Sequence, residues 1–181
     1  MKIIPTPLVI LTFAFVLSMV SCNELEAPVT QIAFEQARAN FYAAYSDAPN
    51  EVKKSAVYIE ALEHGCVFEQ EHGRTFNEWI GEISTIRTDQ GGDEIGQFSI
   101  KASSIHQNVY YEQSDIQKGT ALYENISQFA EGDLVYFSFT FDQGSQTAKI
   151  NECFNETSMT EFGSVADPEF DVTFTTLRSI E

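Results

Sequence analysis

The feature that most constrains the fold is an alternation of apolar and polar residues in the second half of the chain. From Val135 to Phe141 every second side chain is apolar, and the residues between are Tyr, Ser and Thr. Because successive side chains of a strand point to opposite faces, this pattern predicts a half-buried β-strand. Comparable alternation marks four other segments: 76–88, 96–102, 108–112 and 170–177. The domain that they form is therefore expected to be mainly β.

The first of these strands carries two irregularities. Ile83 and Ile86 lie three residues apart, so the apolar phase slips between them, which indicates a β-bulge. Gly81 stands inside the same strand, where glycine marks a bend or a close backbone approach. We expect a long first strand that coils strongly.

Residues 30–65 have a helical period instead. Phe34, Ala37, Phe41 and Tyr45 recur at spacings of three and four residues, the signature of a helix with one buried face. Turn-forming residues 46–50 follow, and then a second helical segment that we expect to end at His64 and Gly65. The sequence thus predicts a helical hairpin over 30–65 and a β-domain over 66–181.

The order of the elements predicts the architecture. Three strands are followed by a short helix near residues 119–130 and then by two more strands. This order, with a long bent first strand, is typical of the OB-fold, a five-stranded Greek-key barrel. We predict an α+β, mainly β fold in which a helical hairpin precedes an OB-like barrel. The alternative is a small open antiparallel sandwich.

The N-terminus is similar to a bacterial lipoprotein signal. Lys2 precedes the apolar run 8–20, which is shorter than the ~20 residues that a transmembrane helix needs. Met19-Val20-Ser21-Cys22 resembles a lipoprotein cleavage box, with Met19 where Leu is usual. We predict that residues 1–21 are a removed signal peptide, Cys22 carries the lipid and 22–29 form a tether. Ordinary signal cleavage and an uncleaved anchor are the alternatives.

Charge limits the partners. The chain has 27 acidic and 10 basic residues, a formal net charge of −17. Nucleic-acid binding depends on Lys and Arg that neutralise phosphates, so we expect no nucleic-acid partner. Anionic headgroups are repelled as well, so membrane attachment is expected through the N-terminal lipid alone.

Two cysteines remain once Cys22 is assigned to the lipid, namely Cys66 and Cys153. In an oxidising compartment two such thiols are expected to pair. Closing so long a loop would stabilise the fold by ~4–5 kcal/mol in the chain-entropy estimate. Two buried free thiols are the alternative.

No motif indicates catalysis or a cofactor. A Gly-x-Ser-x-Gly elbow and a phosphate-binding glycine loop are both missing from the sequence, and we assign no catalytic residue and no cofactor. His64, Cys66 and His72 are weak metal candidates, because their spacing matches no standard zinc signature. We expect no metal there.

A stripe of hydroxyl groups is the candidate ligand face. It comprises the side chains expected to point outward from the last two strands: Tyr136, Ser138, Thr140, Thr173 and Thr175. OB barrels often bind oligomers across a sheet face, so a glycan or a peptide could lie here. A solvated surface without a ligand is the alternative.

Three segments together resemble those of a known group of proteins. They are Trp79-Ile80-Gly81, the strand 135–141, and the tail 156–164 with Pro168-Glu169-Phe170. They are similar to uncharacterised bacterial lipoproteins that carry an OB-like, tRNA-anti-like barrel domain, over most of residues 76–178. Phe139 departs from that pattern, in which a small residue is common. The resemblance implies fold and location and transfers no catalytic residue.

These observations predict a lipid-anchored binding or scaffold domain of the cell envelope that recognises a protein or glycan. Asn23 after Cys22 favours the outer membrane, by analogy with other lipoproteins. The alternatives are an envelope hydrolase and a structural subunit of an envelope assembly.

Overall fold

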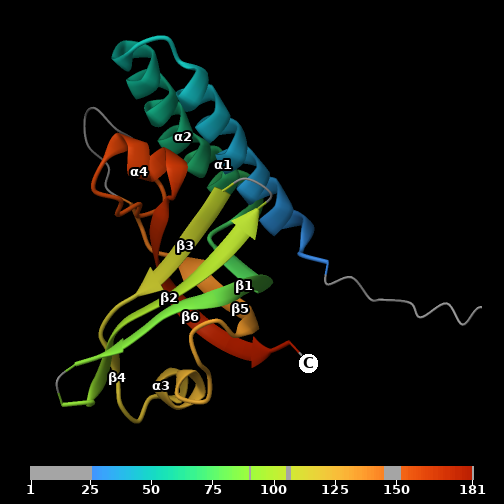
Figure 1. Cartoon of the computed structure of the whole chain (residues 1–181). Coiled ribbons are helices and arrows are strands. Elements are labelled where there is room, and N and C mark those ends of the chain that lie inside the picture. The colour runs from blue at the N-terminus through green and yellow to red at the C-terminus, as the bar shows by residue number, and fades with distance from the viewer. Residues whose placement is uncertain (1–25, 90, 105–106, 145–151, 181) are drawn as a thin grey trace, which may run out of the picture.

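The computed structural model describes residues 26–89, 91–104, 107–144 and 152–180 (Figure 1). The leader and Cys22 lie outside these residues. The elements are α1 (Val29–Asp47), α2 (Glu51–His72), β1 (Thr75–Thr88), β2 (Glu94–Ser104), β3 (Gln107–Gln113), β4 (Ile116–Gln117), α3 (Ala121–Ile126), β5 (Leu134–Phe141), α4 (Glu161–Ala166) and β6 (Glu169–Ser179). None of the helices in the described part of the chain is long and apolar enough to cross a membrane.

Five strands close into a barrel in the order β1-β2-β3-β6-β5, with β5 pairing back onto β1. β3 and β6 run parallel and the other neighbours are antiparallel, while the two-residue β4 pairs with β2. The prediction of an α+β, mainly β chain with an OB-like barrel behind a helical hairpin is confirmed, and the open-sandwich alternative is wrong. In Figure 1 the hairpin stands over one end of the barrel and α3 lies at the other.

β1 serves both halves of the barrel, because it pairs with β5 over its first part and with β2 over its second. The predicted bulge is present as a register shift between Ile83 and Thr85. A Cβ on Gly81 would lie 2.5 Å from Cγ2 of Ile100 and 3.0 Å from the backbone oxygen of Lys101. The expected close approach at this glycine is therefore confirmed, since any side chain would collide with β2.

The predicted end of the second helix is wrong. α2 continues through Gly65 to His72, and Gly73, with φ of 77°, ends it. The buried face of the helix continues with Cys66 and Phe68, which keeps the next turn packed on the molecule. Sequence reading also missed β4 and α4, which are too short to show a period.

The hairpin closes one end of the barrel with aromatic packing. The Phe34 ring of α1 is fully buried and lies 5.0 to 6.2 Å from five other rings: Phe68, Trp79, Phe141, Phe154 and Phe170. Phe139, the departure from the resembling proteins, is also fully buried and packs edge-on against Trp79 at 5.1 Å. Hairpin and barrel therefore share one core.

A side-chain amide joins the hairpin to β1. Gln31 donates to the backbone oxygen of Ile80 at 2.7 Å and accepts from its N–H at 2.8 Å. The same amide donates to Glu35 at 2.7 Å. Because Gln31 is buried, these bonds form away from water and orient α1 on the strand.

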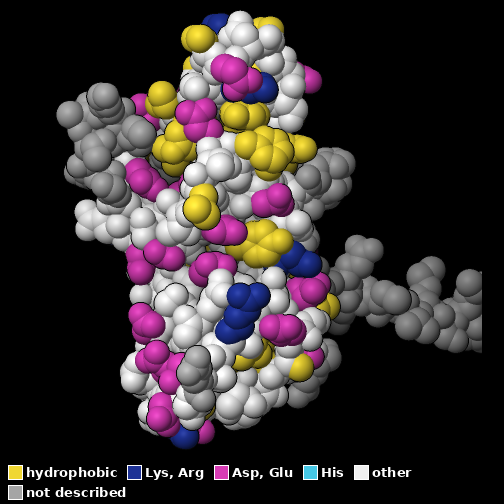
Figure 2. All heavy atoms as spheres, turned by 60° about the vertical axis from the view of Figure 1, so that its left-hand side comes forward, with side chains coloured by type: hydrophobic (Ala, Val, Ile, Leu, Met, Phe, Trp, Pro, Cys, Tyr) yellow, Lys and Arg dark blue, Asp and Glu magenta, His cyan; other side chains and the backbone are white. Residues whose placement is uncertain are grey.

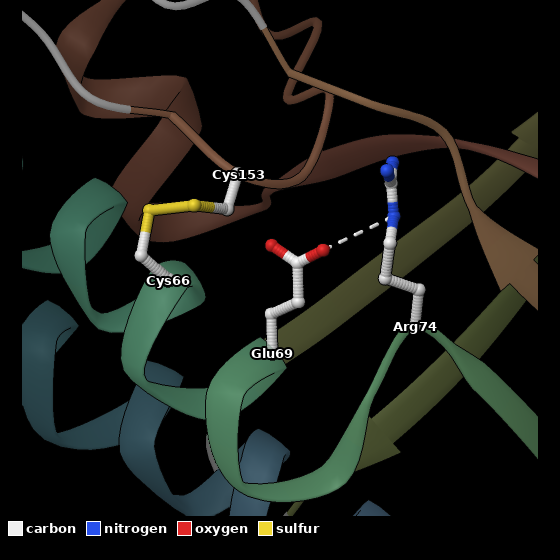
Figure 3. Close-up of a disulfide and its surroundings, with 4 residues drawn as sticks. All are labelled: Cys66, Glu69, Arg74 and Cys153. Atoms are coloured by element: carbon white, nitrogen blue, oxygen red, sulfur yellow. Dashed lines mark ion pairs between the residues drawn. A yellow bond between two sulfur atoms is a disulfide. The ribbon is translucent and has the colours of Figure 1, made fainter.

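A disulfide attaches the hairpin a second time (Figure 3). Cys66 of α2 is bonded to Cys153, which lies before α4, with the two Cα atoms 4.9 Å apart. Glu69 and Arg74 form an ion pair of 3.5 Å beside it, and Arg74 donates to the backbone oxygen of Phe141. Segments 87 residues apart are thereby held together at this end of the barrel.

Candidate functional site

The predicted hydroxyl stripe does not form one open face. Ser138 was expected to point to solvent, but it is buried and its hydroxyl accepts the backbone N–H of Glu78 at 3.1 Å. The reason is a register shift between Phe76 and Trp79, which folds β1 over this position of β5.

Other stripe hydroxyls have partners within the fold. Thr140 shares a hydrogen bond of 3.0 Å with Thr75, and Thr173 donates to Asp142 at 3.0 Å. Thr173 and Thr175 of β6 line different hollows, one on each side of the strand's midpoint. Two members of the stripe thus belong to two separate candidate sites, and Tyr136, Ser138 and Thr140 line neither of them.

The larger site is a groove between α3 and β6, which we call the α3–β6 groove. It consists of two adjoining hollows of about 720 and 230 Å³ that share Asn125 and Leu177. Further lining residues include Phe129, Leu134, Thr175, Arg178 and Ser179. Sequence reasoning placed only Thr175 in a site, because the groove joins segments about fifty residues apart.

The sequence explains how α3 forms its wall of the groove. The hydroxyl of Thr120 accepts the N–H of Tyr123 and caps the helix. Ile126 at the other end of α3 is fully buried in the barrel core. The short helix is therefore anchored at both ends, and Asn125 is held at the boundary of the two hollows.

The polar groups of the groove are unequally satisfied. The side-chain amide oxygen (Oδ1) of Asn125 is buried, and no group in the described part of the chain donates a hydrogen bond to it. Arg178 lies over the ring of Tyr136 at 4.2 Å and pairs with Glu78 at 2.9 Å. The groove thus combines a paired cation with walls of mixed polar and apolar side chains.

The second site is an acidic hollow of about 320 Å³ that is lined by Glu112, Asp142, Asp171 and Thr173. Burial raises the pKa of Glu112, and the nearby charge of Glu169 raises it further. The pKa of Asp171 is raised by burial and by Asp142, although Asn155 donates to it at 2.6 Å. Carboxyl groups with raised pKa in a concavity are suited to general acid–base chemistry.

The weak metal candidates do not come together as ligands. Cys66 is in the disulfide, and the rings of His64 and His72 pack against Phe68 at 6.3 and 4.6 Å. Burial, and then the charge of Arg38, lowers the pKa of His64. Among the described residues no three His, Cys, Asp or Glu side chains are grouped as a metal site would require.

Exposed apolar side chains are found mainly at the hairpin end. Figure 2 shows most hydrophobic side chains in the upper part of this face and acidic ones scattered over the whole of it. Val52 of α2 is 80 % exposed, and Phe162 of α4, which contacts α2, is 55 % exposed. These side chains offer a second surface for association.

Comparison with protein-family models finds no match for this chain, and comparison with curated proteins finds no relative.

Proposed function

We propose that this chain is a lipid-anchored binding domain of the cell envelope that recognises a protein or glycan through the α3–β6 groove. The observation that carries the proposal is the groove itself, two adjoining hollows of about 720 and 230 Å³ between α3 and β6. Concave sites of this size that combine apolar side chains with a few polar groups are where proteins bind their ligands.

Two features support the envelope as its location. The leader with Met19-Val20-Ser21-Cys22 is similar to lipoprotein signals, so the lipid on Cys22 would anchor the domain, in the outer membrane by the analogy of Asn23. The disulfide between Cys66 and Cys153 fits an oxidising compartment, because cytosolic thiols are kept reduced. The net charge of −17 argues against a nucleic-acid partner.

The anchor is tested by intact mass and membrane partition of the full chain beside Cys22→Ala. We expect a lipid mass on wild type and loss of membrane association in the variant. If both proteins are soluble and unlipidated, the envelope proposal fails.

The groove is tested by photo-crosslinking in cells that express the full chain. A benzophenone amino acid in place of Gln128, which lines the groove, should form a discrete protein or glycan adduct. The same amino acid in place of Glu63, exposed on α2, is the matched control. Equal adducts at both positions, or none at Gln128, contradict binding through the groove.

An envelope hydrolase is the second candidate, and the acidic hollow is the observation in its favour. Glu112 and Asp171 both have a raised pKa, as a general acid requires. The test is turnover of peptide, ester and glycoside substrates by wild type and by Glu112→Gln. Turnover that disappears in the variant would establish the enzyme, whereas no turnover by wild type would exclude these substrate classes.

A further inference from the structure

We infer that β6 accepts an extended, cationic polypeptide segment as an additional strand along its open edge, beside α3. The inference rests on the proposed function and names the partner class of the α3–β6 groove. Strand addition of this kind uses the backbone of an exposed sheet edge for affinity and neighbouring pockets for specificity.

The open edge follows from the pairing of the strands. β6 pairs with β3 only over Glu169–Asp171, whereas its pairing with β5 runs from Val172 to Ser179. In the described part of the molecule, β6 after Asp171 therefore has a strand neighbour on one side only. Beyond the pairing with β3, the N–H of Phe174 still donates to the side chain of Gln113 at 2.7 Å.

The register of β6 with β5 identifies the backbone N–H and C=O groups beyond Phe174 that do not bond to β5. Ile180 donates its N–H to the oxygen of Leu134, so in this antiparallel ladder Arg178 and Thr176 also direct their backbone groups to β5, up to the register shift before Phe174. Leu177 and Ser179 lie between them and direct their backbone N–H and C=O groups to the opposite edge. We find no partner for these groups among the hydrogen bonds of the described residues.

The same edge faces the groove. Leu177 lines both hollows although its side chain is buried in the barrel core, and Ser179 lines the larger hollow. Because the side chain of Leu177 is buried in the core, the part of this residue that lines the hollows is expected to be its backbone. Asn125 lines both hollows, so the added strand would pass beside this residue of α3.

Hydrogen-bond chemistry favours a polypeptide over a glycan. Donors and acceptors that alternate along an extended edge match another extended backbone, which presents the same groups at the same spacing. A glycan offers hydroxyl groups but no such repeat. The two hollows on one side of the edge would hold alternate side chains of the added strand.

Charge favours a cationic segment. Arg178, the cation in the lining of the groove, is already paired with Glu78, and Asp133 lines the same hollow. Exposed Glu124 and Glu131 lie nearby on α3 and in the segment before β5, and the chain as a whole carries −17. Such a field attracts basic segments and repels acidic ones.

The test is selection of short random peptides displayed on phage against the full chain in detergent. Ser179→Pro removes the edge N–H without removing a bond to β5, and Ser179→Ala keeps that N–H and is the matched control. Peptides enriched on wild type should be basic, bind Ser179→Ala equally and bind Ser179→Pro at least about tenfold more weakly. Amide exchange of Leu177 and Ser179 should slow when they bind.

A second measurement needs no variant, so it stands even if Ser179→Pro fails to fold. Two N-methylated forms of a selected peptide are compared, one methylated at odd and one at even backbone nitrogens. Methylation of the nitrogens that face β6 should abolish binding, and methylation of those that face away should not. Equal binding of both methylated forms, or enrichment of acidic peptides, overturns the inference.

A glycan array on the same protein separates this inference from the proposed function. A glycan that binds wild type but not Asn125→Leu, with no peptide enriched, overturns strand addition and leaves binding at the groove intact. If neither peptides nor glycans bind, strand addition is overturned, and the crosslink at Gln128 decides whether the proposed function fails as well.

Discussion

The two ends of the barrel differ in how closely they are packed. At the hairpin end, Phe34 packs against five aromatic rings, Gln31 satisfies both backbone groups of Ile80, and a disulfide joins α2 to the segment before α4. At the α3 end, hollows of about 720 and 230 Å³ remain, and the oxygen of Asn125 has no partner among the described residues.

The hairpin end holds contacts that stabilise the fold, whereas the α3 end holds the site proposed for recognition. A buried charge lies beneath the hairpin: Nη1 of Arg38 donates to the backbone oxygen of Ala61 at 2.9 Å and the guanidinium lies 5.0 Å from the Phe34 ring, although its Nε has no partner among the described residues. Burial lowers the pKa of this guanidinium to about 10, so it stays charged at neutral pH. A barrel secured at one end can leave hydrogen-bonding groups open at the other, because its stability does not depend on them.

The largest effect is expected from Phe34→Ala. Truncation of a fully buried phenylalanine leaves a cavity at the hairpin end and should lower the free energy of unfolding by about 4 kcal/mol. Urea denaturation of the full chain in detergent measures it. Phe162→Ala, at a 55 % exposed position, is the control and should change it by less than about 0.5 kcal/mol. Equal losses would contradict the contrast.

Loss of the disulfide should come next. The double substitution Cys66→Ala and Cys153→Ala should destabilise the chain by about 3 kcal/mol, less than the chain-entropy estimate of ~4–5 kcal/mol because a real unfolded chain retains some structure. Reduction of wild type should give the same urea midpoint as the double variant. Two reactive thiols in unreduced, denatured wild type would show that the bond does not form.

Gly81→Ala tests the close approach between β1 and β2. The added methyl group meets Ile100 and the backbone of Lys101, so we expect a loss of about 2 kcal/mol. Gly96→Ala is the matched control, because its nearest heavy atom would be 3.8 Å away. A similar loss at both glycines would contradict the collision, because Gly96 has room for a methyl group and Gly→Ala by itself lowers the entropy of the unfolded chain.

The buried carboxyl group of Glu35 predicts a pH dependence. Burial raises its pKa above 4.5, although the bond from Gln31 opposes the shift. A raised pKa means that the folded state holds this proton more tightly, so stability falls as pH rises from 4.5 through the folded value. Glu35→Gln keeps an acceptor for Gln31 and should be more stable than wild type at neutral pH.

The advantage of Glu35→Gln should shrink as the pH is lowered towards 4.5 and Glu35 becomes protonated in wild type. Thermal melting across this range measures it, with Glu63→Gln on the exposed face of α2 as the control. An advantage that is constant with pH would mean that the carboxyl charge is not its cause.

The smallest effect on stability is expected at the α3 end. Leu134 lines the groove and is 53 % exposed, so Leu134→Ala should change the free energy of unfolding by less than about 0.5 kcal/mol. Binding of a selected peptide should weaken in the same variant. A large loss of stability would mean that the groove wall is part of the core.

Sequence patterns predicted most of the barrel because they reflect local geometry. Alternation located β5 and β6, the slip between Ile83 and Ile86 located a bulge, and Gly81 marked the contact with β2. The end of α2 was missed, because His64 and Gly65 are ordinary helix-ending residues. Only the packing of Cys66 and Phe68 on the barrel continues that helix.

The sequence by itself determined the strands, the two long helices, the acidic charge and the residue types available for a site. The tertiary structure decided which of those residues are exposed and which meet. Ser138 is buried because another strand bulges over it, and the α3–β6 groove exists because β6 leaves β3 after Asp171. Burial and edge pairing depend on contacts between distant segments, and no local pattern in the sequence records those contacts.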